Sequence, residues 1–191
     1  DDNAIQQLIT DMNAGKVSAL IINGVNPSYS LAKASEFNEA LSKVDLKIST
    51  ALSMDETASL CEYVCPDRHY LESWGDAKAS FNKVSFIQPT IQPLFDSRQF
   101  QDSLLVWSGN TISYYDYLKE YWSSKISWSS SLHDGIVELN DEKYSLTKFS
   151  AKVKSIKTKN RDLELSLYQS NSIGDGSQSS NPWLQEFPDP I

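Results

Sequence analysis

The chain has 191 residues, of which 40% are hydrophobic and 22% are charged, and these fractions are typical of a soluble globular protein. A formal net charge of −8, with no Lys/Arg-rich patch interleaved with aromatic residues, argues against a nucleic-acid surface. No apolar run approaches the ~20 residues that a membrane-spanning helix needs, so we expect no direct membrane insertion. The chain starts at Asp1 without an initiator Met and closes on "WLQEFPDPI", and we interpret it as a fragment of a longer polypeptide.

The first third of the chain alternates between helix and strand patterns. Residues 1–15 form a predicted helix, because their apolar positions recur at helical spacing and Gly15 suits its C-terminal end. The strands that follow are predicted at 16–24, 45–52 and 62–65, with helices between them at 33–44 and 53–61. This alternation is typical of right-handed βαβ units. We therefore expect an α/β fold with a parallel Rossmann-like sheet flanked by helices on both faces, its first strand buried on both faces.

The middle of the chain has less regular patterns. Residues 66–81 show no clean period and are predicted to form a long ordered loop. Residues 83–95 follow as an extended segment, in which Pro89 and Pro93 argue against a central strand because proline lacks a backbone donor. A helix is predicted over 97–109.

Beyond Gly109 the composition shifts toward aromatic residues and serine. Residues 113–128 form a predicted aromatic-rich C-terminal helix whose Tyr/Trp stripe we expect to pack against a neighbouring domain. A few antiparallel strands are predicted at 135–140, 146–158 and 162–170. This shift places a domain boundary between an α/β domain at 1–109 and an extension at 110–191 that leads into a truncated barrel domain.

No motif in the sequence specifies a reaction. There is no glycine-rich dinucleotide fingerprint, phosphate loop or nucleophile elbow. Cys61 and Cys65 are expected to be free thiols, with a metal site or a disulfide as alternatives. Glu56 and Glu72 are carboxylates of the kind that can act as acid and base, but we interpret Glu56 as support for a helix start and Glu72 as an anchor of the long loop.

The first predicted strand runs directly into a tight polar loop, "NGVNPSYS", that contains Asn26 and Pro27. The carboxyl end of a parallel strand is where ligands usually bind, and an asparagine there offers both a donor and an acceptor. Asn26 could therefore present its amide to a base edge or a pterin ring. It could equally close its own turn, and the residues alone leave both readings open.

The order of these motifs resembles the third domain of the molybdopterin oxidoreductases, the dimethyl-sulfoxide-reductase superfamily, over roughly residues 1–109. The positions that match the family pattern are Gly24, Asn26, Pro27, Glu56, Thr57, Pro66, Glu72 and Gly75. In the enzymes this domain grips one guanine dinucleotide arm of the cofactor. The resemblance implies that Asn26, Pro27, Thr57 and Glu72 are cofactor-binding positions, either real or vestigial. It implies no catalytic residue and no metal ligand within these 191 residues.

Three further segments, "HYLESWGD", "SLHDG" and "NPWLQEFPDPI", are similar to the large iron–sulfur and molybdopterin-like subunit of alternative complex III. That family belongs to a bacterial membrane assembly that passes electrons from quinol to a periplasmic acceptor. The resemblance implies a periplasmic domain, peripheral to the inner membrane, whose partners are other domains of its own polypeptide and other subunits of the complex. Iron–sulfur clusters would lie elsewhere in the parent chain.

The chain departs from the family pattern where an aspartate is usual, since the strand reads "CEYVCP" here. The loop that follows carries Arg68, His69, Tyr70 and Trp74, bulky side chains that could fill a pocket. We therefore expect a cofactor-free scaffold domain of a quinol-oxidising electron-transfer complex. The alternative is a genuine molybdenum guanine dinucleotide-binding domain of an oxidoreductase, and a third reading is an unrelated small-molecule-binding α/β module.

Overall fold

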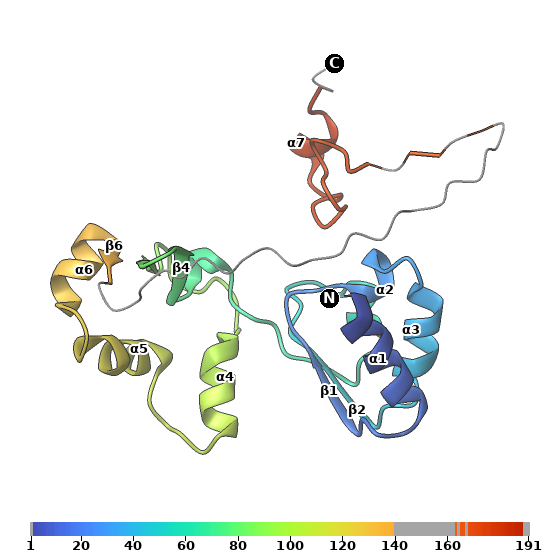
Figure 1. The fold of residues 1–191 in the computed structure, drawn as a ribbon, viewed down its shortest axis with the longest axis horizontal. Coiled ribbons are helices and arrows are strands. Elements are labelled where there is room, and N and C mark those ends of the chain that lie inside the picture. The colour runs from blue at the N-terminus through green and yellow to red at the C-terminus, as the bar shows by residue number, and fades with distance from the viewer. Residues whose placement is uncertain (1, 140–162, 164, 167, 189–191) are drawn as a thin grey trace, which may run out of the picture. The chain divides into compact units, whose positions relative to one another are not determined.

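The computed structural model describes residues 2–139, 163, 165–166 and 168–188 (Figure 1). The chain forms two compact units, residues 1–145 and residues 146–191, and each is described by itself. The domain boundary expected after Gly109 stays a prediction. Among the described residues, none of the helices has the length and apolar character needed to cross a membrane.

The first 65 residues form the predicted parallel sheet. Its strands are β1 (Ala19–Ile22), β2 (Leu46–Ser49) and β3 (Tyr63–Val64), hydrogen-bonded in the order β1-β2-β3 with both pairs parallel. The helical elements that precede and connect them are α1 (Asp2–Asn13), α2 (Pro27–Ser30), α3 (Ala34–Leu41) and the 3₁₀ helix η1 (Ala58–Leu60). Asp55 caps η1, because its Oδ1 accepts a hydrogen bond from the backbone N of Ala58 at 2.7 Å. The α/β fold class is confirmed.

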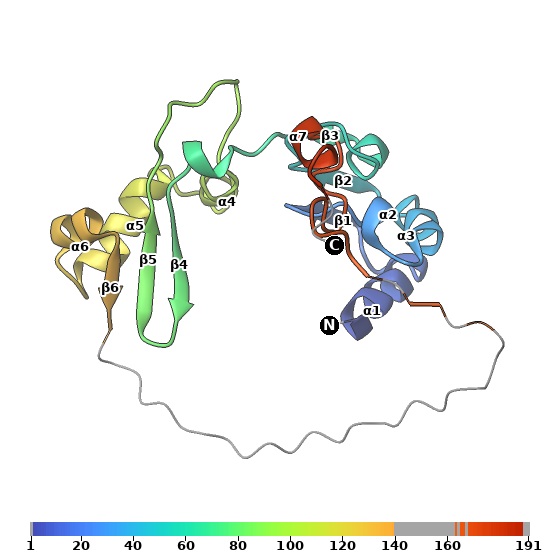
Figure 2. The same ribbon diagram turned by 90° about the horizontal axis from the view of Figure 1, so that it is seen from above.

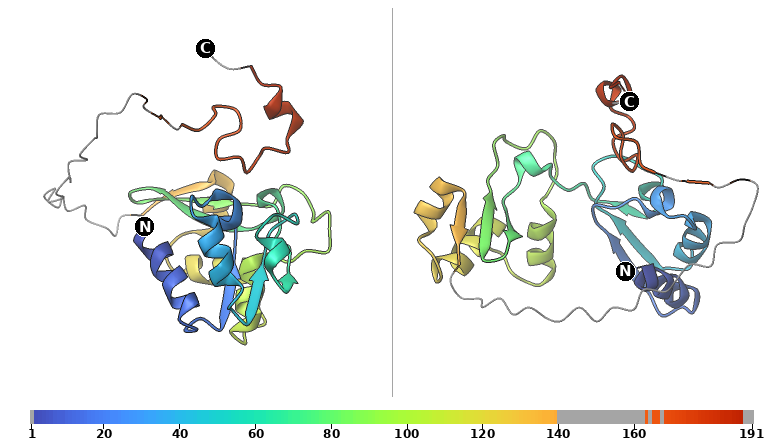
Figure 3. Two further views of the ribbon diagram at one scale, coloured as in Figure 1. Left: turned by 90° about the vertical axis from the view of Figure 1, so that its right-hand side faces the viewer. Right: turned by 45° about the horizontal axis from the view of Figure 1, so that its top comes forward.

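The core of this region lies between the sheet and the two longer helices, which run next to each other on one side of β1 and β2 (Figures 1 and 3). Its buried members are Ile9, Met12, Ile22, Phe37, Ala40, Leu41 and Val44. On β1 only Ile22 is buried, and Ile21 points to the other face with 41% of its surface exposed. The expectation that the first strand is buried on both faces is wrong for the part of the chain that the structure describes.

The predicted loop at 66–81 contains two regular elements, the 3₁₀ helix η2 (Tyr70–Glu72) and strand β4 (Gly75–Ser80). Strand β4 pairs antiparallel with β5 (Lys83–Ile87) through a tight turn at Asn82, whose φ is +56°. Strand β6 (Ile136–Glu138) pairs on the other side of β5, as Figure 2 shows. The proline argument against a central strand was wrong, because β5 is central in this sheet and ends before Pro89.

The helices that follow are α4 (Phe100–Trp107), α5 (Tyr114–Ser123) and α6 (Trp128–Asp134), so the predicted aromatic helix is two helices. Trp122 and Trp128 are buried together with Val84 and Phe86 of β5 and Leu118 of α5. Both indole rings meet the ring of Phe86 edge-on, at centroid distances of 5.7 and 5.4 Å. These tryptophans pack in the chain's own core, so the expectation that the stripe faces a neighbouring domain is wrong for them. For Tyr117 and Tyr121, which are exposed, it stays a prediction.

The predicted strand at 135–140 is confirmed by β6. The strand predicted at 146–158 lies outside the described residues. The strand predicted at 162–170 is not found in the described residues of that segment, where Ser170 makes only an isolated bridge, to Gly174. Near the C-terminus the chain forms turns and then the one-turn helix α7 (Pro182–Gln185). Asn181 caps α7, since its Oδ1 accepts a hydrogen bond from the backbone N of Trp183 at 3.1 Å.

Candidate functional site

The loops that follow β1 and β2 meet at the carboxyl end of the parallel sheet. Gly24 has a φ of +65°, a left-handed conformation that favours glycine and turns the chain sharply after β1. Asn23 then crosses to the neighbouring loop, where its Nδ2 donates to Thr50 Oγ1 at 2.7 Å. The strand end is therefore closed by direct bonds between the two loops.

Asn26 lies at the start of α2, but its side chain does not cap its own helix. Its Oδ1 accepts two hydrogen bonds from Thr57, one from Oγ1 at 2.6 Å and one from the backbone N at 3.2 Å. Its Nδ2 donates to Glu56 Oε2 at 2.7 Å. The amide that could have faced a ligand thus joins the loop after β1 to the loop after β2.

Thr57 is fully buried, and its hydroxyl both donates and accepts a hydrogen bond. Besides donating to Asn26, its Oγ1 accepts a hydrogen bond from the backbone N of Ser28 at 3.0 Å. That N–H belongs to the first turn of α2, where backbone donors have no partner within the helix. Pro27, also buried, occupies the first helical position and needs no such partner. Thr57 therefore caps α2 from another loop, and we call Asn26, Glu56 and Thr57 the strand-end clamp.

Glu56 completes the clamp at the surface. Its carboxylate accepts the bond from the Asn26 amide, and this bond holds the pKa of Glu56 below its ordinary value. Because the ionised form is the better acceptor, the clamp is favoured by a charged Glu56. The structure thus brings together Asn26, Pro27 and Thr57 of the four predicted cofactor positions.

Glu72, the fourth position, lies on η2 and is only 8% exposed. One carboxylate oxygen accepts from the backbone N of Leu94 at 3.0 Å, and the other accepts from the backbone N of His69 at 3.1 Å. The bond from Leu94 is the main cause that lowers the pKa of Glu72. No hydrogen bond among the described residues joins Glu72 to the strand-end clamp. Its geometry is that of the loop anchor suggested by the sequence.

A cavity of about 600 Å³ lies beside Glu72. Its apolar lining consists of Leu52, Pro66, Leu71, Ile91, Leu94 and Phe95. Asp67 also lines it, but its Oδ1 accepts hydrogen bonds from the backbone N of Arg68 and of Phe100. The carboxylates of Glu72 and Asp67 are therefore bonded to the chain's own backbone, and the polar lining is completed by His69, Asp96 and Ser97.

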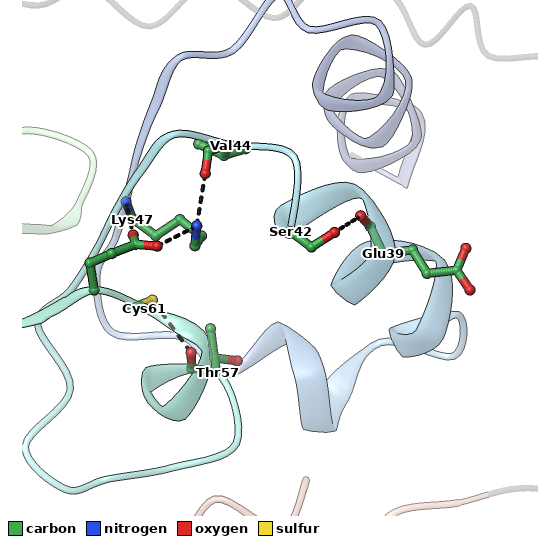
Figure 4. A network of polar contacts seen from close by, with 7 residues as sticks. Glu39, Ser42, Val44, Lys47, Thr57 and Cys61 are labelled. Atoms are coloured by element: carbon green, nitrogen blue, oxygen red, sulfur yellow. Dashed lines mark hydrogen bonds and ion pairs between the residues drawn. The ribbon is translucent and has the colours of Figure 1, made fainter.

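Sequence reasoning missed an ion pair between Lys47 of β2 and Glu62, the residue before β3 (Figure 4). Lys47 of β2 is 7% exposed, and its Nζ lies 2.6 Å from Glu62 Oε1 and donates to the carbonyl oxygen of Val44 at 2.7 Å. The other oxygen of Glu62 accepts from the backbone N of Lys47 at 2.8 Å. Lys47 is the main cause that lowers the pKa of Glu62. The sequence signal for this ion pair was a lysine, Lys47, within an apolar strand and a glutamate, Glu62, next to the following strand.

Both cysteines flank β3 as free thiols. Cys61 is half-buried, and its Sγ donates to the carbonyl oxygen of Thr57 at 3.4 Å (Figure 4). Burial raises the pKa of the Cys61 thiol. Within the described part of the chain, no three histidine, cysteine or acidic side chains gather in a way that could hold a metal ion.

The chain was compared with protein-family models, curated proteins and solved structures. No protein-family model matches the chain. A curated relative, the menaquinone reductase molybdopterin-binding-like subunit of Nitratidesulfovibrio vulgaris (strain Hildenborough), is 32% identical over 95 residues. The aligned residues make up 48% of this chain and 14% of that relative. The resemblance to the molybdopterin oxidoreductase superfamily is confirmed.

A solved structure with a similar fold is also found. Acetylene hydratase from Pelobacter acetylenicus matches with a TM-score of 0.55 and 19% identity. The match covers 71% of this chain and 21% of that enzyme. At this identity the likeness concerns the fold alone.

The family's cofactor can be tested against the residues at the matching positions. None of the four positions carries a buried side-chain nitrogen or oxygen without a partner. Asn26, Thr57 and Glu72 direct their polar atoms to other groups of the same chain. A guanine dinucleotide arm would have to displace these bonds. The residues as arranged do not fit the pterin dinucleotide.

Proposed function

We propose that the chain is a structural domain, without a cofactor of its own, of a molybdopterin oxidoreductase-like subunit in a membrane-associated complex that exchanges electrons with quinones. The relative named above is a subunit of a menaquinone reductase, which supports a place in a multi-subunit electron-transfer complex. The likeness to alternative complex III supports oxidation of quinol and a periplasmic location. Electrons would pass through iron–sulfur clusters in other parts of the parent polypeptide.

The strand-end clamp is the observation that carries this proposal. The positions that would contact a nucleotide hold two loops together, and Thr57 does so with no exposed surface. A ligand that broke these bonds would leave the backbone N of Ser28 without its acceptor. Leaving such a donor unsatisfied costs about 1–3 kcal/mol, which every ligand contact would first have to offset. At this end of the sheet the domain would therefore contribute a stable surface for its neighbours.

The decisive experiment measures the composition of the intact parent polypeptide purified from its native membranes. We expect iron but neither molybdenum nor tungsten by elemental analysis, and no fluorescence of oxidised pterin. Stoichiometric metal and pterin would overturn the proposal and establish the alternative, a genuine molybdenum guanine dinucleotide-binding domain.

A variant of the parent polypeptide separates the two readings at a single position. In Thr57→Val the clamp loses its hydroxyl, so we expect a lower melting temperature with unchanged metal and pterin content. If Thr57 held a cofactor, the same variant would lose pterin.

A thermal-shift measurement with GDP gives an independent reading. A ligand at a hundred times its Kd would stabilise the folded state by about 2.7 kcal/mol. We expect no shift in melting temperature, whereas a dose-dependent rise would favour a nucleotide site.

A further inference from the structure

The segment at residues 90–98, between β5 and α4, is held in place by its backbone. The backbone N of Ile91 donates to the carbonyl oxygen of Leu71 at 3.1 Å. The backbone N of Leu94 donates to the carboxylate of Glu72 at 3.0 Å. These bonds attach the segment to the η2 loop and define the path of its backbone. We call residues 90–98 the display segment.

The display segment holds large apolar side chains in solvent. Phe95 is 82% exposed, Leu94 is 72% exposed and Ile91 is 41% exposed. Across the cavity, Leu52 of the loop after β2 is 59% exposed. Because all four side chains line the same cavity of about 600 Å³, they form one contiguous apolar surface. Single exposed apolar residues are ordinary, but a contiguous apolar surface beside a cavity indicates a binding site.

The polar part of the cavity wall is acidic. The carboxylates of Asp67, Glu72 and Asp96 line it, and among the described residues neither a lysine nor an arginine does. Arg68 is close by, but its Nε donates to the backbone carbonyl oxygen of Ser97. Asp96 is exposed, and within the described part of the chain its carboxylate has neither a hydrogen-bond nor an ion-pair partner. The wall therefore suits a partner with a basic side chain next to an apolar one.

The exposed rim and the charge indicate what kind of partner fits. A small molecule inside the cavity would leave most of Phe95 and Leu94 in water, whereas a protein surface would cover both. A second copy of this chain, with its net charge of −8, would bring like charges together. A backbone already held in place and an unpaired carboxylate at the rim suit a surface that stays in water until another folded protein binds it, because a preorganised surface lowers the cost of association.

We propose that the display segment and its cavity are the docking site for another subunit of the complex. The contact segment of that subunit inserts a large aliphatic or aromatic side chain into the cavity, where Leu52 and Phe95 enclose it. A lysine or arginine within a few residues pairs with Asp96. The inference rests on the proposed function, because that function places the chain in a multi-subunit complex.

Photo-crosslinking in the intact complex tests the occupant directly. The parent polypeptide with Phe95→p-benzoylphenylalanine is irradiated in its native complex, and the crosslinked peptide is identified by mass spectrometry. We expect a peptide of another subunit that contains a large apolar residue and, within a few positions, a lysine or arginine. A crosslink to the same polypeptide or to a second copy would overturn the proposal, as would no crosslink. Tyr121 on α5, which is 47% exposed, is the control position and should not reach that peptide.

A charge reversal tests the acidic part of the wall. In Asp96→Lys the crosslinked subunit should dissociate from the purified complex at a lower salt concentration than in the unmodified complex, because a basic side chain would then face a lysine. Glu39→Lys is the matched control, since Glu39 is exposed on α3 and the change of charge is the same. If both variants released the subunit at the same salt concentration, the assignment of Asp96 would be wrong.

Truncation of the rim tests the apolar part. Phe95→Ala should weaken binding of the crosslinked subunit by roughly thirtyfold or more, the effect of removing a central aromatic anchor. The melting temperature of the parent polypeptide alone should not change, because Phe95 is already exposed. Unchanged affinity would overturn the proposal, and a lower melting temperature would mean that Phe95 supports the fold instead.

The composition of the purified preparation keeps this inference separate from the proposed function. A parent polypeptide that purified from its membranes without any other subunit would contradict the proposed function itself. A multi-subunit complex in which Phe95 contacts none of the other subunits would overturn the docking site alone.

Discussion

The strand-end clamp predicts a specific cost for the change Thr57→Val in the 191-residue chain. Valine keeps the shape of threonine but removes the hydroxyl that donates to Asn26 at 2.6 Å and accepts from Ser28 at 3.0 Å. Losing one hydrogen bond costs about 0.5–1.5 kcal/mol, and leaving the Ser28 N–H without an acceptor costs about 1–3 kcal/mol. We expect the free energy of unfolding to fall by about 2–4 kcal/mol.

Urea denaturation followed by fluorescence measures this loss. With a slope of about 2 kcal/mol per M, the midpoint should fall by roughly 1–2 M. Thr10→Val is the matched control, since Thr10 is exposed on α1 and its hydroxyl bonds only to the carbonyl oxygen of Gln6 within that helix. An exposed change of this kind should stay within about 0.5 kcal/mol. If the two variants had the same midpoint, the clamp would not hold the loops together.

Three further predictions concern other parts of the chain. Trp122→Ala should lower the free energy of unfolding by about 3–5 kcal/mol, far more than the change of half-exposed Tyr121 to Ala, as measured by urea denaturation. Glu72 has a lowered pKa in the folded state, so its stabilisation is full above the ordinary value of 4.5 and is lost as the pH falls through the lower folded value. Denaturation midpoints measured down an acid pH series should therefore fall less steeply in Glu72→Gln than in the unmodified chain. Iodoacetamide should alkylate exposed Cys65 faster than Cys61, whose thiol pKa is raised by burial, and equal rates would contradict that environment.

The first 65 residues were predictable because local signals agree there. Apolar periods, the Asn-Pro turn and Gly15 each point to the same alternation of helices and strands, and this alternation is observed. The chemistry of Asn26 was not predictable, because its partners Glu56 and Thr57 lie 30 and 31 residues further along the chain. Asn26 could contact a ligand or close its own turn, and both roles require a polar side chain at a strand end. Only the fold determines which groups come within reach.

The errors further along the chain have the same origin. Strand β4 reads "GDAKAS", which has no β-branched or aromatic residue, so its conformation comes from pairing with β5 rather than from propensity. The aromatic stretch gave no sign of its partner, because Trp122 packs on Phe86 and donates to Asp76, 46 residues away. An interior and an interface use the same aromatic side chains, and the sequence alone does not distinguish them.

The same reasoning explains how a ligand loop can keep its motif without a ligand. Asparagine and threonine at two adjacent strand ends offer donors and acceptors that suit a nucleotide, and they suit each other equally well at 2.6 Å. Because Asn26, Glu56 and Thr57 hold the loops together, we expect the replacement of any one of them to weaken the fold, and stability alone would then be enough to maintain the motif. The presence of the motif is therefore no evidence of a cofactor. Whether those polar atoms are free to meet a ligand is the relevant evidence, and here they are bonded to one another.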